Sequence, residues 1–262
     1  MSDLLNPLRR ILPPTIKNAM KRRLGLPETR LHSDWSLLQP IGPQRQPHLV
    51  LDVGAHHGWF FHCWLDWCPQ ATVHAFEPYP KSFQQAQQNY GHDPRVTIHP
   101  LGVGAEEGTL PFNVLSESQV SNSFLQPDSR TWDRVAYVHG DVQTMEVPVT
   151  TLDLFCAQHQ IASVYLLKID VQGFEMQVLK GAEQILPVVD HIMVESGIQR
   201  LYANAPRVND VFEFLTARGF HLMAQRSWHR GNHVLMESDL LFRRNGLEGP
   251  VDPTINRVVE AG

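Results

Sequence analysis

The stretch HLVLDVGAHHG, residues 48–58, decides the fold of this chain. Its first six residues form a short and almost wholly apolar run, which is typical of a strand buried on both faces of a parallel sheet. Gly54 ends the run, and residues 58–67 then have the length of a helix. A buried strand, a tight turn and a helix are the opening unit of a doubly wound α/β domain.

The same alternation continues along the chain. We predict further strands at residues 72–76, 96–98, 164–169 and 191–194, and further helices at 80–90, 152–159, 174–186 and 208–218. Two more strands, at 110–114 and 145–149, flank a polar loop, and 221–224 with 240–243 can form a closing antiparallel pair at one edge. Strands that alternate with helices at this spacing imply right-handed βαβ units and a parallel sheet.

The length and composition bound the domain organisation. The chain has 262 residues, of which 42% are hydrophobic and 19% charged, as in an ordinary globular protein. We place one large domain at residues 48–245, between a basic and polar N-terminal extension at 1–47 and a C-terminal tail at 246–262. The net charge of −5 gives the whole molecule no general attraction for nucleic acid.

Nothing in the sequence indicates export or membrane insertion. It has no apolar run long enough to span a bilayer and no signal-peptide core. Its three cysteines have neither zinc-site nor disulfide-framework spacing, which favours free thiols in a reducing compartment. We therefore expect a soluble, cytoplasmic protein.

A basic arm at residues 9–23 contrasts with the negative net charge, and no acidic residue lies between Asp3 and Glu28. Its interleaved apolar residues would allow weak contact with a membrane surface or a partner. Pro13 and Pro14 break any single amphipathic helix, so we favour a solvated arm that packs loosely on the domain.

The turn after the first strand is a candidate ligand site, because ligands of doubly wound sheets bind beyond the carboxyl ends of the strands. Gly54 and Gly58 let the backbone approach a ligand closely, so a side chain added at Gly54 is expected to abolish binding and leave the fold largely intact. Ala55 and His56 stand where the dinucleotide fingerprint G-x-G-x-x-G requires its middle glycine. The turn therefore disfavours the pyrophosphate of NAD.

The end of the second strand supplies a complementary signal. Glu77 ends the stretch HAFE, nineteen residues beyond Gly58, where an acid can accept hydrogen bonds from both ribose hydroxyls of an adenosine. S-adenosylmethionine has no phosphate, and Asp52 with the backbone of the glycine turn can meet its ammonium and carboxylate. The turn and the acid together favour this cofactor.

Acidic residues also follow two later strands, at Asp170 and Glu195. Lys168 lies in the first of these strands, and because lysine is rarely buried unpaired, we expect it to have a carboxylate partner. If the cofactor transfers its methyl group to a hydroxyl, the hydroxyl must lose a proton, and either acid could accept it. Alternatively, the two acids could bind Mg²⁺ together, or both could be structural.

Two histidines in the glycine turn, His56 and His57, are further candidates for the base, because the pKa of imidazole is nearer to neutral. We take Asp170, Glu195 and His57 as the candidate catalytic residues and leave the metal open.

Five motifs in this order resemble the FkbM-type methyltransferase family: LDVGAHHGWF, HAFEPYPKSF, VTTLDLF, YLLKIDVQGFEMQVLKGAEQIL and IMVES. The similarity covers roughly residues 48–219. It implies a Rossmann-like class I methyltransferase fold, with a mainly parallel seven-stranded sheet and helices on both faces. It also implies S-adenosylmethionine as methyl donor and, usually, O-methylation of hydroxyls on sugars or natural products.

The resemblance also implies site residues by position. The cofactor site would be formed by Asp52, Gly54, Gly58, Glu77, Ser121, Asn122 and Asp170. Glu175 matches the same motif as Asp170, whereas a common family form has asparagine at the position of His56.

The sequence therefore predicts an S-adenosylmethionine-dependent enzyme that methylates a hydroxyl of a small-molecule or glycan acceptor. Two alternatives stay open. One is a nucleotide-dependent oxidoreductase, against which the missing glycine argues. The other is a noncatalytic binding module on the same fold. The presence of all four candidate acids argues against it: Asp52, Glu77, Asp170 and Glu195.

Overall fold

The computed structural model describes residues 33–42, 47–116, 121–134, 141–230 and 234–247. The basic arm at residues 9–23, with its predicted membrane or partner contact, lies outside this part of the chain. Among the helices of the described residues, none is long and apolar enough to cross a membrane.

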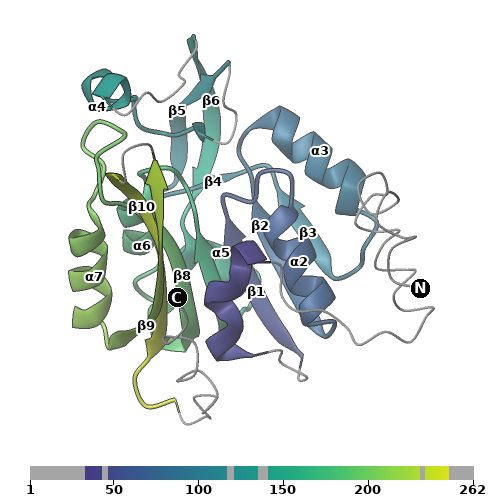
Figure 1. Cartoon of the computed structure of the whole chain (residues 1–262). Coiled ribbons are helices and arrows are strands. Elements are labelled where there is room, and N and C mark those ends of the chain that lie inside the picture. The colour runs from purple at the N-terminus through teal and green to yellow at the C-terminus, as the bar shows by residue number, and fades with distance from the viewer. Residues whose placement is uncertain (1–32, 43–46, 117–120, 135–140, 231–233, 248–262) are drawn as a thin grey trace, which may run out of the picture.

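The domain is built on a seven-stranded sheet with the strand order β3-β2-β1-β7-β8-β10-β9 (Figure 1). Its strands are β1 (His48–Val53), β2 (Ala71–Phe76), β3 (Val96–His99), β7 (Val164–Ile169), β8 (Val189–Gly197), β9 (Phe220–Arg230) and β10 (Val234–Arg244). β10 is antiparallel to β8 and β9, whereas the other neighbouring pairs are parallel. This confirms the predicted mainly parallel Rossmann-like sheet and its closing antiparallel pair.

Helices cover both faces of the sheet, as predicted. One face carries the 3-10 segment η2 (Ser33–Ile41), α2 (Trp59–Trp67) and α3 (Pro80–Tyr90), and the other carries α5 (Leu152–Gln158), α6 (Glu175–Lys180) and α7 (Val208–Ala217). Val50 packs into the core with the first group, and Leu51 packs into the core with the second. Neighbouring strand residues point to opposite faces, so the two cores lie on the two sides of the sheet.

Two segments differ from the expectations. η2 lies in the segment assigned to the N-terminal extension, yet its apolar residues are buried in the core beside α2. The helix expected over residues 174–186 ends at Lys180. Beyond it, the backbone N–H of Gln184 donates to the Asp153 carboxylate at 3.0 Å. In a continuing helix, this N–H would instead donate to a backbone carbonyl four residues earlier. A 3-10 turn, η4 (Leu186–Val188), follows.

A second, three-stranded sheet stands at the top of the view in Figure 1. It consists of β4 (Gly102–Val103), β5 (Gly108–Leu115) and β6 (Val142–Thr150), and the short α4 (Ser129–Arg134) lies nearby. The sequence predicted strands within β5 and β6 but not that they would form a sheet of their own. Asn113 of β5 also pairs with Ser123, so the polar loop is attached to this small sheet.

The turn after β1 lies directly against the end of β7. Gly54 has a φ of +80°, and a Cβ built there would lie 1.8 Å from the carbonyl oxygen of Asp170. The side-chain direction of Gly54 therefore faces protein backbone rather than a ligand. This corrects the expectation that a side chain added at Gly54 would leave the fold largely intact.

Gly54→Ala is expected to lower the free energy of unfolding by more than about 2 kcal/mol, because it adds a backbone clash to an unfavourable φ. Gly219→Ala is the matched control, since Gly219 has a φ of +83° with no atom within 4 Å of its Cβ position. Urea unfolding of both variants measures the difference. Equal losses would show that the contact with Asp170 can relax at little cost.

A group of aromatic and histidine rings joins β2 and β3 to α5. The Nδ1 of His74 and the Nε2 of His99 are 3.0 Å apart, and both rings contact Phe155. Burial, together with the neighbouring His74 and His159, lowers the pKa of His99 to about 4. The unfolded chain therefore binds this proton more readily, so the stability that depends on neutral His99 is complete above pH ~6.5 and is lost as the pH falls towards 4.

We expect the free energy of unfolding of the wild type to fall between pH 6.5 and 4, and that of His99→Phe to fall by about 1–2 kcal/mol less, allowing for solvent around the half-buried ring. Chemical denaturation across this pH interval makes the comparison. Parallel pH curves for the two proteins would mean that His99 is protonated in the folded state at no cost.

Candidate functional site

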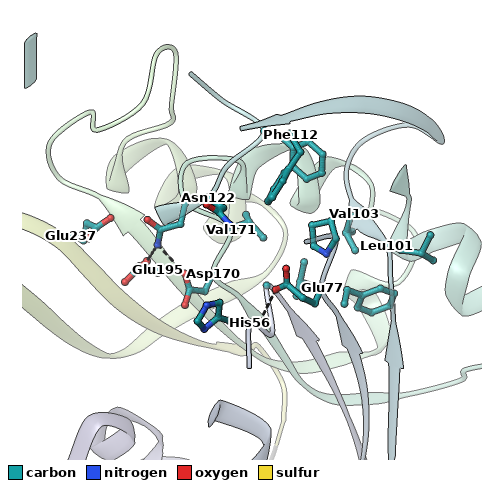
Figure 2. Close-up of a pocket in the computed structure, with 17 residues that line it drawn as sticks. His56, Glu77, Leu101, Val103, Phe112, Asn122, Asp170, Val171, Glu195 and Glu237 are labelled. Carbon is teal, nitrogen blue, oxygen red and sulfur yellow. Dashed lines mark hydrogen bonds between the residues drawn. The ribbon is translucent and has the colours of Figure 1, made fainter. Parts of the chain in front are cut away.

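A cavity of about 340 Å³ lies where the carboxyl ends of β1, β2, β7 and β8 meet the small sheet (Figure 2). Six of the residues predicted from the sequence line it: Gly54, His56, Glu77, Asn122, Asp170 and Glu195. The other four predicted residues do not line it in the described structure: Asp52, His57, Gly58 and Ser121.

Asp52 lies beneath the cavity, in a buried ion pair that joins β1 to β7. Its Oδ1 is 3.1 Å from the Nζ of Lys168, which also lies 3.6 Å from Asp170 and donates a hydrogen bond of 2.7 Å to the carbonyl of Gly54. Burial alone would lower the pKa of Lys168, but the two carboxylates hold it above its ordinary value. The predicted carboxylate partner of Lys168 is thereby confirmed.

Glu77 marks one end of the cavity. Its carboxylate accepts the backbone N–H of His56 at 2.7 Å and that of Tyr79 at 2.8 Å, and only 6% of the residue is exposed. Burial raises the pKa of Glu77 to about 7, although the two backbone donors act in the opposite direction. Two fixed donors hold the carboxylate in one orientation, which is what recognition of a polar ligand requires.

The two histidines of the turn have different positions. His56 adopts a left-handed φ of 50° and lines the cavity, and its ring stacks on that of His57 at 3.7 Å between centroids. Burial lowers the pKa of His56 to about 4, so its ring is neutral at neutral pH. Both histidines were candidates for the base and His57 was kept among the candidate catalytic residues, but His56 is the one that lines the cavity.

Gln172 joins the two acids at the opposite end. Its Nε2 donates to Glu195 at 2.7 Å and to Asp170 at 3.2 Å, the two dashed contacts at the left of Figure 2. The hydroxyl of Tyr202 donates to its Oε1 at 3.1 Å, and the hydroxyl of Ser123 donates to its backbone carbonyl at 2.7 Å. Every polar group of the Gln172 side chain is thus engaged.

Gln172 is a site residue that was not predicted from the sequence. Its only signal was a Gln-Gly pair in the turn after a buried strand, and the structure gives Gln172 a φ of 54° there. A non-glycine residue with a positive φ is uncommon, and such residues concentrate at functional sites.

The two acids have opposite protonation tendencies. Burial would raise the pKa of Asp170, but Lys168 and the hydrogen bond from Gln172 lower it below its ordinary value. Burial raises the pKa of Glu195 well above its ordinary value, and the neighbouring carboxylates of Asp170 and Glu237 reinforce the shift. Asp170 is therefore the more readily ionised of the two acids, and Glu195 is the one that more readily holds a proton.

A bound Mg²⁺ ion does not fit this arrangement. The amide N–H of Gln172 already donates to both acids, and a cation between them would have to displace it. In the described part of the chain, no three or more His, Cys, Asp or Glu side chains are grouped so that they could hold a metal ion.

The remaining walls come from the small sheet and the polar loop. Asn122 lines the cavity, and its Oδ1 accepts the backbone N–H of Leu115 at 3.0 Å, whereas Ser121 is buried behind it. On the side of Glu77, the apolar residues Val103 and Phe112 face the cavity (Figure 2). The cavity thus has an apolar region beside Glu77 and an acidic end at Asp170 and Glu195.

Comparison with known proteins gives a consistent assignment. A model of the methyltransferase FkbM domain matches residues 52–222. The 2-O-methyltransferase NoeI of Sinorhizobium fredii is 27% identical over 218 residues, which are 81% of this chain and 84% of that protein. The 31-O-demethyl-FK506 methyltransferase FkbM of Streptomyces tacrolimicus is 25% identical over 246 residues, covering 86% and 93% of the two chains.

The fold agrees with this assignment. The crystal structure of methyltransferase FkbM from Methylobacillus flagellatus KT superimposes with a TM-score of 0.51 at 15% identity, over 81% of this chain and 48% of that one. This chain therefore spans about half the length of that structure, and the likeness concerns the fold alone. Because the domain model covers well over half of the 262 residues, the chain belongs to the FkbM family of S-adenosylmethionine-dependent methyltransferases.

Proposed function

We propose that the chain transfers the methyl group of S-adenosylmethionine to a hydroxyl of a sugar, glycan or natural product. One observation carries the proposal: a single cavity has a backbone-held carboxylate, Glu77, at one end and the pair Asp170 and Glu195 at the other. The names of two relatives, a 2-O-methyltransferase and a 31-O-demethyl-FK506 methyltransferase, support oxygen as the acceptor atom.

The residues present fit the donor. The carboxylate of Glu77 would accept the ribose hydroxyls, and the apolar side chains of Val103 and Phe112 would pack against the adenine. The carboxylate of Asp52 is already paired with the ammonium of Lys168, which donates to the carbonyl of Gly54. Asp52 would therefore act indirectly, by holding the glycine turn whose backbone reaches the amino-acid end of the donor. S-adenosylmethionine supplies a methyl group on a positively charged sulfur.

The acidic end would position and deprotonate the acceptor. The charged carboxylate of Asp170 can accept the proton that the hydroxyl loses as its oxygen is methylated. The amide of Gln172 holds that carboxylate in place, and the ammonium of Lys168 favours its ionised form. Gln172 is accordingly a positioning residue, and the acids need no metal to be held together.

The two alternative functions, an oxidoreductase and a noncatalytic binding module, can be distinguished from a methyltransferase. Family membership leaves the oxidoreductase without support, and a noncatalytic module would bind S-adenosylhomocysteine but transfer no methyl group. The cytoplasmic location and the lack of nucleic-acid partners stay predictions, as do the donor contacts of Gly58 and Ser121 and the catalytic role of His57.

S-adenosylhomocysteine should bind with a Kd in the micromolar range, and Glu77→Gln should weaken it about tenfold through loss of the charged acceptor. Since the pKa of Glu77 is raised to about 7, the wild-type affinity should rise about fivefold from pH 6 to pH 8. Calorimetry at the two pH values measures both effects. Glu77→Gln should show a flat pH dependence, and the exposed Glu213→Gln on α7 should behave as the wild type; a pH dependence retained in Glu77→Gln would remove Glu77 from the ribose site.

Asp170→Asn should lower methyl transfer by at least about a hundredfold, because the acceptor proton has no carboxylate to go to, while S-adenosylhomocysteine still binds. Radiolabelled transfer to a panel of methyl glycosides measures the rate, and calorimetry measures the binding.

The same assay tests the metal. After exhaustive treatment with EDTA, the wild type should keep full activity, because Gln172 occupies the position between the acids. Activity that disappears with EDTA and returns with Mg²⁺ would overturn the metal-free arrangement, and full activity in Asp170→Asn would overturn the role of that carboxylate.

A further inference from the structure

Two buried polar side chains that the proposed chemistry does not use line a second, smaller cavity. Glu175 and Ser196 are each only 2% exposed, and both line this cavity. Among the residues that the structure describes, Glu175 Oε2 and Ser196 Oγ have no hydrogen-bond partner, whereas Glu175 Oε1 accepts the backbone N–H of Gly173 at 2.8 Å. Buried polar atoms are nearly always hydrogen-bonded, so two unpartnered oxygens on one cavity can bind a further polar group there.

The second cavity adjoins the acidic end of the first. Both are lined by Glu195 and Glu237, which lie in Figure 2 at the end away from Glu77. Its outer wall is the segment after β8, including Gln199, Tyr202 and Pro206. A molecule whose reacting hydroxyl lies at Asp170 and Glu195 therefore lies next to this cavity.

The size and chemistry of the cavity select one kind of group. Its volume is about 10 Å³, which is close to the space that one water-sized oxygen occupies. Burial raises the pKa of Glu175 to about 8, so this carboxyl is protonated at neutral pH and can donate a hydrogen bond. The hydroxyl of Ser196 can donate or accept. A neutral hydroxyl is both a hydrogen-bond acceptor and a donor, so it can accept from Glu175 and donate to Ser196.

We propose that the cavity formed by Glu175 and Ser196 binds a second hydroxyl of the acceptor, adjacent to the hydroxyl that is methylated. The inference rests on the proposed function and narrows its substrate class to acceptors with neighbouring hydroxyls, such as the vicinal diols of a sugar ring. A water molecule has the same hydrogen-bonding chemistry and is the other source of such an oxygen, so the experiment separates the two.

The kinetic test uses the best substrate among methyl glycosides and its set of monodeoxy analogues. With the wild type, removal of one hydroxyl next to the methylated one should raise KM about tenfold with little change in kcat. Ser196→Ala should reduce this discrimination to less than twofold. Glu175→Gln should retain it, because an amide supplies the same donor and acceptor, whereas Glu175→Ala should lose it.

Two controls keep the result interpretable. Ser82→Ala, on α3, removes another fully buried hydroxyl with no hydrogen-bond partner in the described structure, and it should leave the discrimination unchanged. S-adenosylhomocysteine should bind all the variants as it binds the wild type, because neither Glu175 nor Ser196 lines the donor cavity. Equal KM values for all deoxy analogues, or full discrimination in Ser196→Ala, would overturn the inference while leaving the proposed function in place.

A structural test decides the case in which no glycoside is methylated although S-adenosylhomocysteine binds. That result would contradict the sugar acceptor of the proposed function. Crystals of the S-adenosylhomocysteine complex grown without polyol and then soaked in glycerol should show a glycerol hydroxyl between Glu175 and Ser196. A dry cavity, or a water molecule that glycerol leaves in place, would overturn the inference by itself.

Discussion

The buried ammonium of Lys168 is the constraint on which the site depends. Lys168 belongs to β7, and its ammonium lies 3.1 Å from Asp52 of the paired strand β1 and 3.6 Å from Asp170, and donates to the carbonyl of Gly54. A charge buried at 3% exposure without partners would be strongly destabilising, so the two strand ends and the turn must close around it. The same ammonium holds Asp170 ionised. One interaction thus shapes the glycine turn and sets the charge of the proposed base.

A second consequence is that the pKa values of the two acids, Asp170 and Glu195, shift in opposite directions. Asp170 is close to Lys168, which lowers its pKa, whereas Glu195 is close to other carboxylates, and these together with burial raise its pKa. Gln172 donates to both and is itself fixed by Tyr202. Gln172 adopts an unfavourable positive φ, and this backbone conformation directs its amide towards the two acids. The Gln172 amide therefore bridges the two acids, as a cation does between paired carboxylates elsewhere.

The parts of the site that are far apart in the chain are brought together by the small sheet. The polar loop is paired to Asn113 of β5, and from there Ser123 reaches the backbone of Gln172. Tyr202, from the segment after β8, donates to the carbonyl of Ser121 as well as to Gln172. These contacts attach the small sheet and the loop after β8 to the carboxyl edge of the main sheet, where the two cavities share Glu195 and Glu237 as lining residues.

The sequence by itself determined the alternating strands and helices, the sheet and its faces, and the acids at strand ends, because apolar periodicity and turn chemistry are local signals. Glu77, Asp170 and Glu195 could be found in this way, and the need for a partner to Lys168 followed from the cost of a buried charge. Only the tertiary structure decided that Gly54 faces protein backbone and that Gln172 bridges two acids. Those facts depend on which segments meet in space, and no local pattern encodes contacts between residues so far apart in the chain.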